Sequence, residues 1–598
     1  MNTTDYQRLI QSPQYRQAAR RVVRQLLEAL LFEDCLRDVQ ATDDGVELPA
    51  VSAGGAPVTY RCAVRRTASF GRIRIQGPVL RCDASAQTEA DDVALLLSEL
   101  AGQLDADPVR LQQFGLELLS TQIKDAQSHH ANGHAGQPLR EAGYDAIEAR
   151  LTGAHPYHPG YKSRMGFTLG DNGRYAPECA APLQPVLLAA HRSHCRWNLG
   201  NAEASPGSLL PPAARAAFEA AVRGHGADPA DYLPLPVHPW QWDEVIAPGY
   251  HGAFARGELI AVGEMPVRYL PQQSIRTLAN VDQPDALSLK LAMNLVNTST
   301  SRVLAPHTVC NAAVLSDWLA GLVARTEWSA PMAAPVLLRE VAGVSHVPAA
   351  PVQGQYGALS CIWRESIHGH LAFGEAAVPM TALTHIDVDG LPLIDPWIRR
   401  HGVRPWLQRL VERAWLPVLH LLWEHGTALE SHAQNMLLLH VDGLPQRVAL
   451  KDFHDGVRFS RQWLSGTAPQ LTPPPAEHAR VNPNSFIETD DAEELRDFTC
   501  DALFFVNLAE LAPLLAAHYQ LEETEFWTIV AGVIRGYQRA HPRLAESFRR
   551  FDCFAPTMSI ELLASRRFMP EIRLRTRQAP NPLAQAEALG ALVEAEAA

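Results

Sequence analysis

Two acids and an amide lie close together in segment 424–458 and could bind a hard cation. Glu430 lies five residues before Asn435, and Asp452 follows Asn435 by 17 positions. ATP-using enzymes hold magnesium beside the phosphates with oxygen ligands of these types. We therefore interpret Glu430, Asn435 and Asp452 as candidate magnesium ligands. A polar loop with a solvated aspartate is the alternative interpretation.

Two His-Pro pairs and two cations occupy the segment Gly153–Phe167, GAHPYHPGYKSRMGF. Proline fixes φ and stiffens the chain, so His158, Lys162 and Arg164 would be presented at defined angles. A stiff cationic loop suits an anion such as a triphosphate. A plain rigid turn and metal binding by the two histidines are the alternatives, although a proline after each histidine prevents the pair from sharing a helical face.

A third group of anion-binding side chains lies in QQSIRTLAN and LSLKLAMNLVNTSTSRV, residues 272–280 and 287–303. If the second segment is one strand, Lys290, Asn294 and Thr298 share one face. Polar side chains on the inner wall of a sheet are costly without a ligand, which favours a phosphate or carboxylate cleft over a solvated face. Arginine is the natural clamp for either anion. The candidates are Ser274, Arg276, Thr277, Lys290, Asn294, Thr298 and Arg302.

These side chains need a mixed α+β scaffold to hold them. The turn pair Asp442-Gly443 between two apolar runs predicts a β-hairpin that carries the candidate magnesium ligands. Residues 1–150 read as mostly helical, with strand-like alternation between residues 48 and 81. Residues 151–365 are rich in short strands and turns, and residues 366–598 are helical around the hairpin. We therefore expect three domains.

The composition is that of an ordinary soluble protein and argues against several classes of function. The formal net charge of −13 argues against a nucleic-acid binder, which normally shows a basic face. The nine cysteines form no CxxC pair and indicate free thiols in a reducing cytoplasm. The polar N-terminus has no apolar signal core, and no run approaches 18 apolar residues, so we expect a cytoplasmic protein outside the membrane. The sequence also lacks a P-loop, a GxGxxG motif and a GxSxG elbow.

Two enzyme classes could use these residues. A kinase fits the acid, the asparagine and the Asp-Phe pair, although the acid is Glu430 instead of aspartate and the Gly-rich phosphate lid and Val-Ala-Ile-Lys strand are missing upstream. An ATP-dependent ligase that activates a carboxylate also explains Arg276 and Arg302, which a kinase acting on a hydroxyl would not need. A non-catalytic protein would leave Glu430, Asn435 and Asp452 without a metal.

Five motifs occur in the order found in one enzyme family: GAHPYHPGYKSR, SIRT, KLAMNLVNTSTSR, ESHAQN and KDFHDG. Through them the chain resembles the NRPS-independent siderophore synthetases, the aerobactin-synthase (IucA/IucC) family. The motifs cover residues 150–460, and the length and helical C-terminus extend the resemblance to the whole chain. Each motif alone is weak, whereas five in order are specific. The residues after Asp452 fit only loosely, because they vary between subgroups.

The resemblance implies a cupped-hand architecture, with a thumb over residues 1–150, fingers over 151–365 and a palm over 366–598. It implies an enzyme that uses ATP and magnesium to adenylate a carboxylate such as citrate. An amine, hydroxylamine or alcohol then displaces AMP and gives an amide or ester. The implied partners are small-molecule carboxylate and amine substrates, and the implied assembly is a homodimer.

The resemblance also assigns roles to matched positions. His432, Arg302 and Lys290 would be catalytic, with His432 on the substrate side of the hairpin. The three candidate magnesium ligands keep that role. The nucleotide and its phosphates would be contacted by His158, Lys162, Ser274, Arg276, Thr277, Lys290, Thr298, Arg302 and Gln434.

Overall fold

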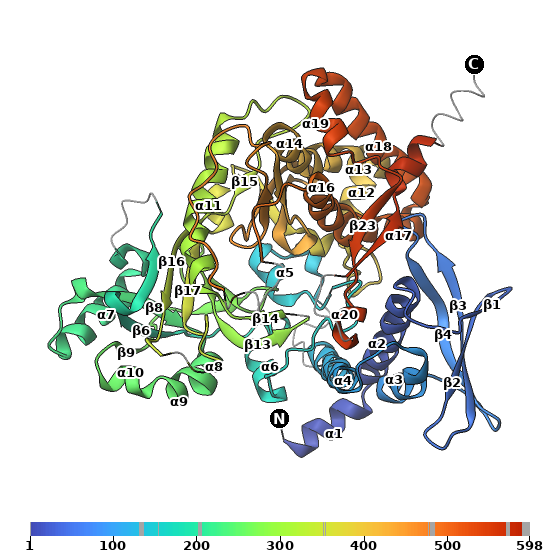
Figure 1. Ribbon diagram of the computed structural model, residues 1–598, viewed down its shortest axis with the longest axis horizontal. Coiled ribbons are helices and arrows are strands. Elements are labelled where there is room, and N and C mark those ends of the chain that lie inside the picture. Colours follow the sequence, from blue (N-terminus) through green and yellow to red (C-terminus); the bar gives the residue numbers. More distant parts are fainter. Residues whose placement is uncertain are drawn as a thin grey trace.

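Helices and sheets are mixed along the whole chain, which confirms the broad α+β prediction (Figure 1). N-terminal elements lie at the lower right of this view, the central sheets at the left, and the C-terminal helices at the top. The computed structural model describes residues 2–130, 137–153, 155–200, 206–298, 300–350, 352, 354–476, 478, 485–569 and 575–588.

The first 130 residues combine four helices with a five-stranded antiparallel sheet of order β1-β2-β3-β4-β5. Ser12 begins the second helix because its hydroxyl accepts a hydrogen bond from the Tyr15 N–H. Strands form between residues 48 and 81, where the alternation of apolar and polar residues predicts them. The sheet nevertheless takes a larger share of residues 1–130 than the prediction of a mostly helical region implies. The elements are α1 (Thr3–Gln11), α2 (Pro13–Phe32), β1 (Gln40–Thr42), β2 (Gly45–Val51), β3 (Pro57–Arg66), β4 (Ile73–Cys82), β5 (Gln87–Glu89), α3 (Val93–Leu100) and α4 (Pro108–His130).

Six strands form the main sheet of the central region, in the order β10-β11-β12-β17-β16-β7. In this sheet Lys290 lies opposite Thr277 on one side and Ile362 on the other. A three-stranded sheet of order β8-β6-β9 lies in the same region. The strands are β6 (Val186–His191), β7 (Cys195–Asn198), β8 (Tyr232–Val237), β9 (Leu259–Glu264), β10 (Tyr269–Pro271), β11 (Thr277–Asn280), β12 (Ser288–Leu291), β16 (Glu340–His346) and β17 (Ser360–Arg364).

Seven α-helices lie between residues 144 and 325 in the described part of the chain. The long helix α11 packs against β16 and β7. The helices are α5 (Tyr144–Arg150), α6 (Leu169–Tyr175), α7 (Pro212–Gly224), α8 (Pro239–Gln241), α9 (Ala247–Gly249), α10 (His251–Ala255) and α11 (Pro306–Arg325).

The prediction of one strand through Lys290, Asn294 and Thr298 is wrong. The chain leaves the six-stranded sheet at Ala292, and the next strands, β13 (Met293–Asn297) and β14 (Thr300–Arg302), pair with each other, while Val296 also forms an isolated bridge with Met165. Asn294 faces away from the expected wall, because its side chain donates to Gly354 O and accepts from Gln241. Alternation alone could not reveal the break, since both strands continue the same apolar and polar pattern.

The hairpin predicted around Asp442-Gly443 is present as β20 (Met436–Val441) and β21 (Leu444–Leu450). It forms the centre of a four-stranded sheet of order β15-β21-β20-β18. Two small antiparallel pairs, β19 with β22 and β23 with β24, complete the strands. The bounds are β15 (Val336–Leu337), β18 (Ala376–Pro379), β19 (Thr427–Leu429), β22 (Val457–Phe459), β23 (Thr557–Glu561) and β24 (Thr576–Pro580).

Helices enclose the hairpin, as predicted for the C-terminal part. Their packing buries Trp406, Trp415 and Trp423 completely. The helices are α12 (Asp395–His401), α13 (Val403–Leu410), α14 (Leu416–His425), α16 (Ala492–Cys500), α17 (Ala509–Tyr519), α18 (Glu523–Ala540), α19 (Ala545–Arg550) and α20 (Ser565–Phe568).

The largest apolar cluster joins the two ends of the chain. Phe32 stacks on Phe505 with ring centroids 5.6 Å apart, and Phe70 meets the edges of Phe505 and Trp527. A separate cluster fills the central region between Leu183 and Trp363.

The continuous helical stretch Ala492–Tyr519 is long and apolar enough to cross a membrane by length and composition, but most of it is buried inside the protein, as in a core helix. All nine cysteines are free, as their spacing predicts.

Gly443 provides a test of the hairpin turn. Its φ is +78°, and a Cβ there would lie 2.1 Å from Cγ of Trp397. We expect Gly443→Ala to lose about 1 kcal/mol from the left-handed backbone and a further ~1–3 kcal/mol from overlap with the indole. Gly390 is the matched control, because its φ is +80° and a Cβ would meet nothing within 4 Å. Thermal unfolding followed by circular dichroism should give a lower midpoint for Gly443→Ala than for Gly390→Ala, and equal midpoints would contradict the packing argument.

Candidate functional site

The Asp452 carboxylate joins the hairpin to the central sheet. Asp452 follows β21, and its Oδ1 lies 3.0 Å from Lys290 Nζ and 2.7 Å from Arg364 Nη1. Lys290 and Arg364 come from the paired strands β12 and β17. Both cations are buried, and they hold the pKa of Asp452 well below its usual range although burial alone would raise it. Asp452 is therefore ionised and fixed between two cations.

Two further arginines lie beside this group. Arg276 Nη1 donates to the carbonyls of Arg302 and Val303, each at 3.1 Å. Arg302 Nη2 donates to Asn297 O at 3.1 Å and to Thr298 Oγ1 at 3.2 Å. Among the described residues, the buried Nε of Arg302 has no hydrogen-bond partner.

The electrostatics of this cation group are unfavourable in the absence of a ligand. Burial and the nearby Arg276 lower the pKa of Arg302 to about 9, while Glu430 and Asp452 oppose the shift. Burial lowers the pKa of Lys290 to about 8, despite the attraction of Asp452. Cations that depress one another's pKa values in a buried region indicate a site for an anion.

Ser274 and Thr277 lie at the turn into β11, next to Lys290. The Ser274 hydroxyl donates to Thr277 Oγ1 at 2.8 Å, and it accepts a hydrogen bond from the Thr277 N–H at 3.3 Å. Thr277 is buried and directly opposite Lys290 in the sheet. Ser274 is therefore fixed to the residue that lies opposite the lysine.

Backbone strain marks three positions of this region. Ile275, Thr298 and Asp452 have φ values of +70°, +59° and +68°. Positive φ is unusual for any residue except glycine and is a genuine outlier for the β-branched Ile275 and Thr298. Such conformations cost about 1–3 kcal/mol each and cluster at functional sites, where surrounding contacts hold them.

The segment before β20 presents Glu430, His432, Gln434 and Asn435. Asn435 Nδ2 donates to Glu430 O at 3.1 Å, and the Asn435 N–H donates to His432 O at 2.9 Å, which folds this segment into a tight turn. Burial lowers the pKa of His432, which keeps its ring neutral at pH 7, while Glu430 and Asp452 oppose the shift. The turn is thus placed within the electrostatic influence of Asp452 and Arg302.

The His-Pro loop supplies two histidines in a fixed tautomer. His155 Nδ1 accepts hydrogen bonds from the backbone N–H groups of Tyr157 and His158, at 3.2 and 3.0 Å. His158 Nδ1 accepts from the Gly160 N–H at 2.9 Å. Each ring must carry its proton on Nε2. Among the described residues, the buried His158 Nε2 has no partner, which makes it a neutral donor ready for a ligand.

Buried acids pair with Lys162 and Arg164, two of the predicted anion ligands. Lys162 Nζ lies 2.9 Å from Asp125 and 3.2 Å from Glu178, and it also donates to Thr152 O. Arg164 donates to Asn172 and to both oxygens of Glu178. Their charges are already compensated by buried carboxylates. The interpretation of these two cations as anion ligands is therefore corrected to a structural role.

Several residues that position the site were missed in the sequence. Arg364 holds Asp452, and His454 Nδ1 lies 2.5 Å from Glu340 Oε1, which ties the segment after the hairpin to β16. Lys451 Nζ lies 3.2 Å from Glu148 on α5. A charged residue that ends an apolar strand, as Arg364 does in LSCIWRES, was the available signal.

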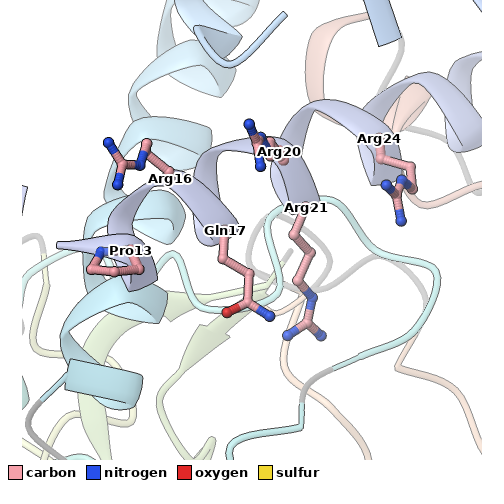
Figure 2. Close-up of a pocket in the computed structure, with 6 residues that line it drawn as sticks. All are labelled: Pro13, Arg16, Gln17, Arg20, Arg21 and Arg24. Carbon is pink, nitrogen blue, oxygen red and sulfur yellow. The ribbon is translucent and has the colours of Figure 1, made fainter. Parts of the chain in front are cut away.

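A separate hollow lies along α2 and is lined by its arginines (Figure 2). The side chains of Arg16, Arg20 and Arg24 project from the helix at four-residue spacing. None of the predicted site residues lines this hollow. Arg20 and Arg21 are each within ion-pair distance of an acid, Glu89 and Asp125.

Lys162 and Lys290 form a matched pair for a stability test, since both are 2% exposed. We expect Lys162→Met to cost about 3–5 kcal/mol, because it leaves Asp125 and Glu178 as buried acids with fewer cations. Lys290→Met should cost much less, because Arg364 still pairs Asp452 and repulsion from Arg276 is relieved. Thermal unfolding of both variants checks this, and an equal or larger loss in Lys290→Met would show that Lys290 is structural.

Several known proteins match almost the whole chain, and two family models match most of it. Residues 143–385 match the model of the IucA / IucC family, and residues 404–578 match that of the ferric iron reductase FhuF-like transporter. The chain is 36% identical to the citryl-spermidine/3,4-dihydroxybenzoyl-citryl-spermidine:spermidine ligase of Bacillus anthracis, over 98% of this chain and 97% of the relative.

A second relative and a solved structure give the same result. A 2-[(L-alanin-3-ylcarbamoyl)methyl]-3-(2-aminoethylcarbamoyl)-2-hydroxypropanoate synthase of Staphylococcus aureus is 37% identical over 94% of this chain and 92% of its own length. The crystal structure of the petrobactin biosynthesis protein AsbB of Bacillus anthracis superposes with a TM-score of 0.91 at 34% identity, covering 99% of this chain and 100% of that one. The chain therefore belongs to the IucA/IucC family of NRPS-independent siderophore synthetases.

Proposed function

We propose that this protein adenylates a carboxylate with ATP and magnesium and then condenses it with an amine, hydroxylamine or alcohol, releasing AMP and pyrophosphate. The observation that carries the proposal is the buried cation group of Lys290, Arg276 and Arg302, in which Lys290 pairs with Asp452 and Arg302 Nε has no hydrogen-bond partner among the described residues. A triphosphate and a polycarboxylate together supply the negative charge that this group lacks. The relatives' names, which include a citryl-spermidine ligase, support citrate or a citrate derivative as the acid.

Magnesium fits the oxygen ligands of the hairpin. Glu430 and Asp452 offer carboxylates and Asn435 an amide oxygen, and magnesium is usually bound by one or two carboxylates together with substrate phosphates. We assign these three residues to the ion. When bound, it neutralises charge on the phosphate oxygens.

The reaction divides into two displacements. A carboxylate oxygen of the acid attacks the α-phosphorus of ATP, the bond to the β-phosphate oxygen breaks, and pyrophosphate leaves. The nitrogen of the amine then attacks the acyl carbonyl, the C–O bond to AMP breaks, and the amine loses a proton. Lys290, Arg276 and Arg302 stabilise the charge on the phosphate oxygens in the first step. Their buried, pre-ordered positions avoid reorganisation during the reaction.

The neutral donors complete the proposed site. His158 presents an Nε2–H without a partner among the described residues, and the neutral His432 lies on the turn that also carries Glu430. We assign His158 to a phosphate or carboxylate oxygen and His432 to the acid substrate. Ser274, Thr277, Thr298 and Gln434 would contact the nucleotide, as would Arg276, Lys290 and Arg302.

We further propose that residues 1–150, 151–365 and 366–598 act as thumb, fingers and palm around this cleft. Separate apolar clusters in the central region and in the N-terminal sheet and helices support that division. A homodimer and a cytoplasmic location belong to the same proposal.

Pyrophosphate release distinguishes this proposal from a kinase. ATP, Mg²⁺ and a panel of acids (citrate, 2-oxoglutarate and succinyl hydroxamates), each with several amines, should yield AMP and pyrophosphate. Arg302→Ala and His432→Ala should each lower carboxylate-dependent pyrophosphate exchange by about 100-fold or more, the loss typical of a group that contacts transition-state charge. Arg399→Ala is the control, because its side chain is 69% exposed. Release of ADP, or full activity in either site variant, would contradict the assignment.

The pKa of Lys290 predicts a pH dependence. ATP binds better when Lys290 carries its ammonium charge. The affinity of the protein for ATP is therefore highest below pH 8, and it falls by up to about tenfold per pH unit above pH 8. We expect kcat/KM for ATP in the exchange reaction, which contains no amine, to decrease above pH 8. Lys290→Arg should move this decrease to higher pH, because a guanidinium holds its proton more strongly than an ammonium group. An unchanged profile in Lys290→Arg would assign the titration to another group.

A further inference from the structure

Three hydrogen-bond donors converge on the buried carboxylate of Glu148, which lies on α5 outside the five motifs. Glu148 Oε1 accepts hydrogen bonds from the Tyr144 hydroxyl and from Lys451 Nζ, each at 3.2 Å. Its Oε2 accepts one from the Gln273 N–H at 3.3 Å, and the side chain is 3% exposed. The donors belong to α5 itself, to the segment that follows β21 and to the turn that precedes β11. One carboxylate therefore joins three parts of the protein.

A chain of side-chain hydrogen bonds leads from the Tyr144 hydroxyl to Asp452. Tyr144 Oη accepts from Gln272 Nε2 at 3.3 Å, and Gln272 Oε1 accepts from Arg364 Nη2 at 2.8 Å. Arg364 Nη1 donates to Asp452 Oδ1 at 2.7 Å. Because Lys451 directly precedes Asp452, these contacts close into a ring, which we call the Glu148 ring. Its members are Glu148, Tyr144, Gln272, Arg364, Asp452 and Lys451.

The donors of the ring all point toward its two carboxylates. Arg364 donates to Gln272, the Gln272 amide donates to Tyr144, and the phenol donates to Glu148. Burial and the charge of Glu148 raise the pKa of Tyr144 well above its usual value, which keeps the phenol protonated. A glutamine at position 148 would turn an amide N–H toward one of these donors or toward the Gln273 N–H. The ring therefore requires a carboxylate at this position.

One side of the ring fixes the end of the hairpin. The Lys451 N–H donates to Asn435 O at 3.1 Å, so this lysine contacts one proposed magnesium ligand and directly precedes another, Asp452. The φ of Asp452 is +68°, a conformation that surrounding contacts must hold. The Lys451 side chain anchors this strained segment to α5 through Glu148.

The other side of the ring fixes the turn that leads into β11. Gln273 lies between Gln272 and Ser274, and its Nε2 donates to Glu148 O at 2.6 Å, in addition to the contact of its backbone N–H. Ile275, two residues further on, has a φ of +70°. Helix α5 lies near the middle of the molecule in Figure 1, where the turn and the hairpin both contact it.

We propose that Glu148 is a positioning residue of the adenylation site. It acts through Gln273 on the turn that would contact the phosphates, and through Lys451 on the carboxylate that would bind magnesium. This inference rests on the proposed function, because it assigns ATP to the space between that turn and the hairpin. Both contacts depend on one carboxylate, so loss of Glu148 releases both sides of the site together.

Equilibrium binding of ATP to the whole protein tests this role without turnover. Isothermal titration calorimetry is performed with Mg²⁺ and with EDTA, and thermal unfolding of the ligand-free protein is measured in parallel. Glu148→Gln should raise the Kd of ATP in Mg²⁺ by about tenfold or more, the loss typical of a residue that orients a metal ligand. The increase should be smaller but present in EDTA, where only the turn contributes.

Glu375→Gln is the matched control, because Glu375 has the same kinds of contact on the far side of the hairpin. Its side chain is 5% exposed, and it accepts hydrogen bonds from the Ala372 N–H at 3.0 Å and from Arg447 Nε at 3.0 Å. This variant should lower the unfolding midpoint and leave the Kd of ATP unchanged. If Glu148→Gln also lowers the midpoint without changing the Kd in Mg²⁺, Glu148 is purely structural and the proposal is overturned.

Tyr144→Phe provides a second variant, because it removes one hydroxyl from the ring and should fold even if Glu148→Gln does not. It should raise the Kd of ATP in Mg²⁺ by about threefold or more, the effect of one hydrogen bond. If Glu148→Gln does not fold, an unchanged Kd in Tyr144→Phe overturns the proposal.

The same measurements distinguish failure of the positioning role from failure of the proposed function. A wild-type protein that binds no ATP would contradict both. A wild-type protein that binds ATP but shows no carboxylate-dependent pyrophosphate exchange would contradict adenylation alone, and the effect of Glu148→Gln on ATP binding would still decide the role of Glu148.

Discussion

The ion pair of Asp452 with Lys290 and Arg364 is the contact on which the proposed site depends. It connects two apolar cores that share no strand, since Lys290 and Arg364 belong to the central sheet and Asp452 to the hairpin. Buried ion pairs contribute little net stability, because desolvation offsets most of the attraction. The ion pair of Asp452 instead fixes a position: it holds the hairpin, with the turn that carries Glu430 and His432, against the central sheet beside Arg276 and Arg302.

Two buried lysines show how similar sequence signals can have different physical consequences. Lys162 is surrounded by acids and completes a structural network, whereas Lys290 shares one acid with Arg364 and is repelled by Arg276. Charge compensation, not burial, separates the two cases. A cation group with too few acids is less stable than it could be, which is the usual relation between stability and function in binding sites.

Local signals predicted much of this structure. The Asp-Gly turn and its apolar flanks predicted the hairpin, because turn type and strand alternation act over a few residues. The pairing of Arg364 with Asp452 could not be predicted, since 88 residues separate them and tertiary packing brings them together. The strand break at Ala292 was hidden because the alternation continues across it. Lys162 was misread for a related reason, because its partners Asp125 and Glu178 lie outside the motif that contains it.

The fixed tautomers of the His-Pro loop limit which groups of the protein can accept a proton. An imidazole whose Nδ1 accepts backbone N–H bonds cannot gain a proton there without losing those bonds, and the pKa of His155 is lowered to about 3 by burial and by the nearby His432. The loop can therefore orient an anion at any physiological pH without itself changing charge. In the proposed reaction the loop would not receive the proton that the amine gives up, so this proton would leave through a different group or through water.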